Sequence, residues 1–268
     1  MEKYIKLNYL LLTRLFLTGS ILSIFLFLVN IQRVDILSDK SLEGIFLLSF
    51  GDLNISGIKY GIPLLFWLLP MVFLLYFLGD DMASDFGRNA VYIFTRTHQR
   101  KIWFLAKSLS LFFYIFLYYF VQFFVLWIIA SVYGLHLVNS EEGIFVILSM
   151  LILLILQSFI VLLMINLLAL RTTQIIAYTI VFAGYIASLF FSNFLYEIQW
   201  CIGIIKWLPF TQGIFSWHNG IPSSVIAFIV TDFHLQNFSV LFSIIYQVVI
   251  TTLLIILGTH KIEDMDIF

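Results

Sequence analysis

Six long apolar stretches constrain the fold of this chain more than any other feature. A helix needs about 20 mainly apolar residues to cross the hydrocarbon core of a bilayer, and each stretch approaches that length. We therefore predict an all-α polytopic membrane protein with about six transmembrane helices in a single transmembrane domain, residues 1–268. The predicted spans are residues 10–30, 60–79, 104–132, 144–168, 175–196 and 238–258.

The composition agrees with burial in a membrane. Hydrophobic residues make up 62% of the chain and charged residues 11%, whereas a soluble domain is about 45–50% apolar. The formal net charge of −1 provides no attraction to nucleic acid, so we expect no nucleic-acid partner. No small-x-small cleavage site follows the first apolar run, which we expect to remain as the first span.

The distribution of Lys and Arg predicts the orientation, because these residues collect on the cytoplasmic side of a membrane. If the N-terminus is cytoplasmic, ten of the 14 lie on or beside that side, and an even number of spans returns the C-terminus there. The other four, on the outer side, are Arg33, Lys40, Lys59 and Lys206.

The stretch from Gly79 to Lys107, here called the elbow, is the one part of the chain that burial in a membrane does not explain. It opens with three carboxylates and ends in a basic cluster where the third span begins. Its middle has the period of an amphipathic helix, so we predict a cytoplasmic helix between spans 2 and 3. The apolar face comprises Met82, Phe86, Ala90 and Ile93.

These residues resemble the cytoplasmic coupling segment of ABC-2 type (type V exporter-like) permeases, the membrane subunits of ABC exporters. In that family an acidic residue and a glycine precede a short apolar helix, and Thr or Ser, Arg and a span-opening Lys follow. Here the chain has Arg96 where the family often has Pro, and Asp85 where it often has Glu. The matching positions are Asp85, Gly87, residues 91–94, Thr95, Arg96 or Arg100, and Lys107.

The resemblance implies a bacterial cell-membrane permease subunit that performs no covalent chemistry. GxxxxGK[ST] is absent, so MgATP would sit on a separate ATPase subunit dimer. A second permease subunit would complete a homo- or heterodimer. A cavity lined by the many Phe, Leu and Ile residues of the chain would suit a hydrophobic or amphipathic substrate, such as an antimicrobial peptide or a lipid-like molecule, which is compatible with bacteriocin immunity. The residues implied to contact the ATPase are Asp85, Phe86, Gly87, Ala90, Ile93, Thr95, Arg96, Arg100 and Lys107.

The basic cluster of the elbow has a second interpretation. Arg96, Arg100 and Lys101 could fix the topology and pair with anionic lipid headgroups, at about 1 kcal/mol per charge. The amphipathic segment before the cluster favours docking of an ATPase, since topology alone needs no such spacer.

Residues 197–237 hold two apolar pieces, 198–208 and 221–230, that are too short to span. We predict re-entrant or interfacial helices between spans 5 and 6, as the resemblance also implies, with a turn at Trp207, Pro209 and Phe210. An amphipathic surface loop is the alternative. The apolar patch at 45–50 is also too short to cross and is expected on the outer leaflet.

Nothing in the sequence predicts catalysis or a metal site. The polar residues inside the spans are uncharged, and we expect them to hydrogen-bond between helices. The five histidines lack ligand spacing and are expected at the membrane surface, and the single Cys201 excludes an intrachain disulfide. Three other classes remain open: a secondary transporter, a membrane enzyme, and an accessory immunity or anchoring protein. The polar span residues are Gln122, Gln157, Asn166 and Gln247.

Single cysteines at Ser140 and Thr97, introduced in a Cys201→Ser background, test the orientation. We expect an impermeant thiol reagent on intact cells to label position 140 and to spare position 97, because the basic bias puts the elbow in the cytoplasm. Labelling at 97 but not at 140 would reverse the orientation.

Overall fold

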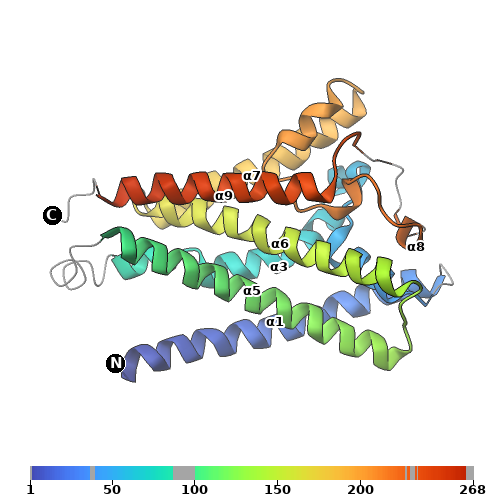
Figure 1. The fold of residues 1–268 in the computed structure, drawn as a ribbon, viewed down its shortest axis with the longest axis horizontal. Helices are drawn as coiled ribbons and strands as arrows, with labels where there is room; N and C mark the ends of the chain where they lie inside the picture. Colours follow the sequence, from blue (N-terminus) through green and yellow to red (C-terminus); the bar gives the residue numbers. More distant parts are fainter. Residues whose placement is uncertain are drawn as a thin grey trace.

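The computed structural model describes residues 2–36, 40–86, 100–226, 228–229, 233 and 235–263, and within this part the long elements are all helices (Figure 1). Six described helices are long and apolar enough to cross a membrane, which makes the chain a multi-pass membrane protein. They are α1 (Glu2–Ile36), α3 (Ile62–Leu78) with its continuation to Phe86, α5 (Arg100–Tyr133), α6 (Ser140–Ala169), α7 (Gln174–Glu197) and α9 (Val240–Glu263).

The six predicted spans coincide with these helices, and most of the helices extend a few residues further. The extension at two starts comes from polar caps. Asn139 Oδ1 accepts a hydrogen bond from Glu141 N (3.2 Å), and Thr173 Oγ1 accepts one from Ile176 N (3.4 Å). Such caps satisfy backbone donors that the first turn of a helix leaves free. At these two starts, a span predicted from apolar residues alone begins too late.

Helix α6 is the centre of the bundle. It packs against α5, α7 and α9 and runs between α5 and α9 in Figure 1. Of its most apolar 18-residue window, 78% is buried within the chain, against 11% for α9. Helix α9 thus presents most of its apolar surface to the membrane or to another chain, whereas α6 is a core helix.

The two ends of the bundle differ. The first residues of α1 and the last residues of α9 lie at one end, here called the terminus end (Figure 1). The opposite end is closed by short elements, here called the cap, that come from residues 40–60 and 198–239. These are α2 (Leu42–Phe46), the π-helix η1 (Leu47–Gly51), the 3-10 helices η2 (Ile55–Tyr60), η3 (Ile202–Trp207) and η4 (Phe215–Trp217), and α8 (Ser223–Ile226).

The two pieces of the cap are joined by buried hydrogen bonds. Trp217 Nε1 donates to the Leu53 carbonyl at 2.8 Å, and Leu53 N donates to Ser216 Oγ at 3.4 Å. Asn193 of α7 donates from Nδ2 to the Ile55 carbonyl at 2.8 Å. These contacts satisfy backbone groups of the loop next to η1 that water does not reach.

The structure corrects the expectation for the apolar patch at 45–50. Its residues Ile45, Phe46 and Leu47 have no exposed surface, because α2 and η1 insert between α1, α5 and α6. Gly44 permits this packing, since a Cβ there would lie about 2.6 Å from the Phe228 ring. The patch is therefore part of the protein core, because its partners lie far away in the sequence.

The apolar pieces between α7 and α9 form shorter helices than predicted. Only Ser223–Ile226 is α-helical in the described part of residues 221–230, and η3 is a 3-10 helix. Pro209 follows η3 in a turn, as expected of a residue that lacks a backbone donor. The cap is held by tertiary contacts more than by helical hydrogen bonds.

Trp217→Phe tests the joint between the two cap pieces. Trp217 is 1% exposed, and its loss leaves the Leu53 carbonyl buried without a donor. We expect the lost hydrogen bond alone to lower the free energy of unfolding in detergent by about 1–3 kcal/mol. Trp207→Phe is the control, because that ring is 56% exposed and should cost under about 0.5 kcal/mol. Equal losses in the two variants would contradict this role of Trp217.

Candidate functional site

The elbow is described only at its two edges. Asp85, Phe86, Arg100 and Lys107 belong to the described residues, and the other predicted contact residues lie outside them. Those others are Gly87, Ala90, Ile93, Thr95 and Arg96.

Lys107 joins the two edges of the elbow. Its Nζ lies 3.0 Å from Asp85 Oδ2 and 3.4 Å from Asp81 Oδ2, which connects α5 to the continuation of α3. The three side chains are 26%, 17% and 25% exposed, so water screens this cluster less than a surface ion pair. The structure thus brings together two of the predicted site residues, Asp85 and Lys107.

The start of α5 is also fastened to the end of α9. Arg100 Nη1 donates to the Glu263 carbonyl at 3.0 Å, and Lys101 Nζ lies 2.9 Å from Glu263 Oε1. On the other side of the elbow, the Phe86 ring packs at 6.1 Å from the Trp103 ring. The described edges of the elbow therefore contact α5 and α9.

Asn166 of α6 fastens the point where α3 ends. Its Nδ2 donates to the Leu78 carbonyl at 3.1 Å, and its Oδ1 accepts from Met82 N at 2.9 Å. Between helices α9 and α6, Gln247 Nε2 donates to Gln157 Oε1 at 3.2 Å. The prediction of hydrogen bonds between helices is confirmed for these three side chains. The side-chain amide of Gln122 has no such bond in the described structure.

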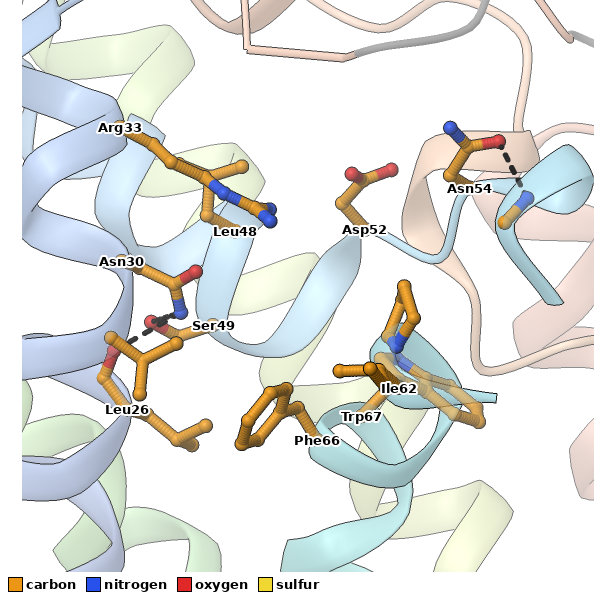
Figure 2. Close-up of a pocket in the computed structure, with 13 residues that line it drawn as sticks. Leu26, Asn30, Arg33, Leu48, Ser49, Asp52, Asn54, Ile62, Phe66 and Trp67 are labelled. Carbon is orange, nitrogen blue, oxygen red and sulfur yellow. Dashed lines mark hydrogen bonds between the residues drawn. The ribbon is translucent and has the colours of Figure 1, made fainter. Parts of the chain in front are cut away.

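A cavity of about 240 Å³, with both polar and apolar walls, lies at the cap end, between α1, η1, η2 and the start of α3. Figure 2 shows the Arg33 guanidinium and the Asp52 carboxylate turned toward the same space, with apolar rings below them. Asn30 is held in the wall by hydrogen bonds from Nδ2 to the Leu26 carbonyl (3.0 Å) and to Ser49 Oγ (3.4 Å). The polar lining residues are Asn30, Arg33, Ser49, Asp52 and Asn54.

Asp52 is the unusual group of this cavity. Its Oδ1 is buried and has no hydrogen-bond partner in the described part of the chain. Burial raises the pKa of Asp52 from 3.8 to about 6, and a hydrogen bond from Ser216 and the charge of Arg33 offset this only in part. The cavity thus offers a cation and a carboxylate that is half-protonated near pH 6. This arrangement suits the binding of a small polar group.

Residues 25–268 match the sequence profile of a family described as "Protein of unknown function (DUF2705)". The chain belongs to this DUF2705 family. No curated protein and no solved structure matches it. The profile covers all six described spans except the first part of α1, so the cavity, the cap and both edges of the elbow are parts of the DUF2705 region.

The predicted turn at Trp207, Pro209 and Phe210 lies in the cap of this DUF2705 chain. The Trp207 carbonyl accepts a hydrogen bond from Tyr246 Oη of α9 at 2.7 Å. The nearly buried Phe210 ring meets Tyr185 of α7 edge-on, with centroids 5.0 Å apart. The turn therefore connects α7 with α9.

His218 contradicts the expectation that the histidines lie at the membrane surface. It is fully buried and stacks on Phe238, with ring centroids 4.1 Å apart. Its Nε2 lies 2.7 Å from Ser243 Oγ and its Nδ1 lies 3.1 Å from the Phe215 carbonyl. Burial lowers the pKa of His218 to about 4, so the ring is neutral at pH 7. Its burial depends on contacts across the cap, which local sequence does not reveal.

Sequence reasoning also missed two other groups. Glu43 is fully buried in α2, where its carboxylate accepts a hydrogen bond from Val138 N at 3.2 Å. The pair of Arg33 and Asp52 could have been suspected, because each ends an apolar run. The described residues hold no group of three or more His, Cys, Asp or Glu that could bind a metal.

The pKa of Asp52 predicts a pH dependence of stability. Because the folded pKa lies above the ordinary value of 3.8, the stabilisation by the bound proton is full below about pH 4 and is lost as the pH rises through about 6. The free energy of unfolding of the wild type should fall by about 2–3 kcal/mol relative to Asp52→Asn between pH 4 and pH 7. Chemical unfolding in detergent at both pH values measures this difference. Parallel pH profiles would show that Asp52 has an ordinary pKa.

Proposed function

We propose that this chain is the membrane permease subunit of a bacterial ABC exporter and that the elbow receives movement from a separate ATPase subunit. One observation carries the proposal. Both described edges of the elbow are fastened to neighbouring helices, through Lys107 to Asp81 and Asp85 and through Arg100 and Lys101 to Glu263. A segment meant only to fix topology needs no such attachments.

The proposed arrangement places both termini and the elbow in the cytoplasm. An ATPase dimer carrying MgATP docks on an amphipathic coupling helix, and a second permease subunit completes the transport pathway. The cap then faces outward, and the segment around Trp207 and Pro209 dips into the outer leaflet as a re-entrant or interfacial piece.

Transmission follows from the contacts at the edges of the elbow. A push on the elbow moves the start of α5, and the ion pairs of Lys107 and Lys101 pass the movement to the end of α3 and to α9. Helix α6 is largely buried and serves as the fixed element. The bundle thus has the parts needed for a rigid-body change between two packed states.

A wide groove supports an amphipathic or hydrophobic substrate. It lies between α3 and α7 and has a volume of about 1040 Å³. Its walls are mainly apolar, and Tyr76 on its surface is 77% exposed. A molecule with a long apolar part fits such a site. The residues of α7 in its wall include Tyr178, Phe182, Ala183, Ile186 and Ala187.

Phe86→Asp tests the docking of an ATPase. Phe86 is half-buried beside Trp103, and a carboxylate in an apolar contact costs several kcal/mol unless it is neutralised. We expect the amount of ABC ATPase that co-purifies from native membranes, and its ATP hydrolysis in lipid discs, to fall at least tenfold. Arg96→Glu should weaken docking as well, by reversal of a charge.

Glu141→Lys is the control, because it reverses a charge in the exposed first turn of α6 at the cap end. It should leave ATPase binding intact. Unchanged elution of each variant in gel filtration shows that the permease remains folded. If Phe86→Asp keeps full ATPase binding and full transport, the elbow is only a basic topology signal, and the exporter proposal loses its main support.

A further inference from the structure

A second groove lies on the other side of α7. Its floor is α6 and its walls are α7 and α9, and it has a volume of about 400 Å³. Helices α7 and α9 each pack on α6, which leaves the space above α6 between them. The apolar residues that line it are Met164, Leu167, Leu168, Ile180, Val181, Leu254 and Leu257.

The groove is open to the surroundings of the bundle. Ile180 is 55% exposed and Leu257 is 63% exposed, so their side chains need an apolar partner from outside the chain. Gly258 also lines the groove, but the missing side chain does not enlarge it. The Phe104 ring already fills the space that a Cβ of residue 258 would occupy. In a membrane, a slot of this kind accepts an acyl chain.

Two cations stand at the mouth of the groove at the terminus end. Arg171 lies in the turn between α6 and α7, and Lys261 lies in the last turn of α9. No ion pair or side-chain hydrogen bond to either is found among the described residues, and no Asp or Glu lines this groove. By contrast, the mouth of the wide groove between α3 and α7 carries Asp80.

Cations near the C-termini of helices are common, because they interact favourably with the helix dipole. That effect applies to Lys261 in the last turn of α9 and to Arg171 just after the C-cap of α6, each taken separately. It does not account for the meeting of two cations from different elements at the mouth of one apolar slot, where neither has an ion-pair partner among the described residues. The combination matches an amphiphile that has an anionic head and a long apolar tail.

We propose that this groove binds one anionic phospholipid, with the phosphate between Arg171 and Lys261 and an acyl chain along Leu257 and Ile180. The two charges select the headgroup, since each basic residue near a membrane surface contributes about 1 kcal/mol toward an anionic lipid. The neighbouring groove with Asp80 at its mouth disfavours the same lipid. The site is independent of any ATPase or transported substrate.

Native mass spectrometry of the purified chain in detergent tests the proposal with phosphatidylglycerol and phosphatidylcholine of equal chain length. We expect the wild type to bind one phosphatidylglycerol roughly 30-fold more tightly, the ratio that about 2 kcal/mol from two charges gives. The double variant Arg171→Gln, Lys261→Gln should bind both lipids equally. Leu257→Trp fills the slot with the charges intact and should weaken the binding of both lipids.

Arg14→Gln is the matched control, because Arg14 is an exposed cation on α1 outside the groove. It should change the preference less than twofold. Inorganic phosphate at millimolar concentration should not displace the lipid. An equal loss in Arg14→Gln would mean general attraction to the surface, displacement by phosphate would mean a simple anion site, and no loss in Leu257→Trp would mean that the slot is not used. Each of these results overturns the proposal.

Discussion

The side chain of Asn166 makes the interaction on which the terminus end of the bundle depends. A backbone polar group that is buried within the protein needs a hydrogen-bond partner there, and the break after Leu78 removes helical partners on both sides of it. Asn166 supplies a donor to Leu78 and an acceptor to Met82 from one amide. A glycine is needed at position 79 of this junction. The Tyr178 hydroxyl occupies the position that the Cβ of any other residue would take. The chain can therefore turn away from α3 while the Leu78 carbonyl and the Met82 amide both keep a hydrogen-bond partner.

The hydrogen bonds of Asn166 also affect the elbow. The segment whose position they fix carries Asp81 and Asp85. These two carboxylates meet Lys107 only because the helix that continues from α3 is aimed at α5. A single buried amide in α6 thus sets the direction in which the charged edge of the elbow points. Both the packing of the core and the proposed transmission rest on the same residue.

The spans were predictable because their signal is local: an apolar run of sufficient length has few alternatives to a transmembrane helix. The candidate sites were predictable only in part. Asp85 and Lys107 stood out as charges beside apolar runs, but their ion pair depends on how α3 lies against α5. The cavity of Arg33 and Asp52 and the burial of Glu43 and His218 depend on the fold of the cap. Its partners are distant in sequence, and no periodicity encodes such contacts.

The separation between the partners in the cap also sets an order in time. Trp217 and the Leu53 carbonyl that it binds are 164 residues apart, and a ribosome that adds about 5–20 residues per second needs roughly 10–30 s to cover this interval. The hydrogen bond between Val138 N and the Glu43 carboxylate can form sooner, because Val138 lies only 95 residues later in the chain. During synthesis the first cap piece must therefore remain hydrated, and it can move into the core only after its later partners have emerged.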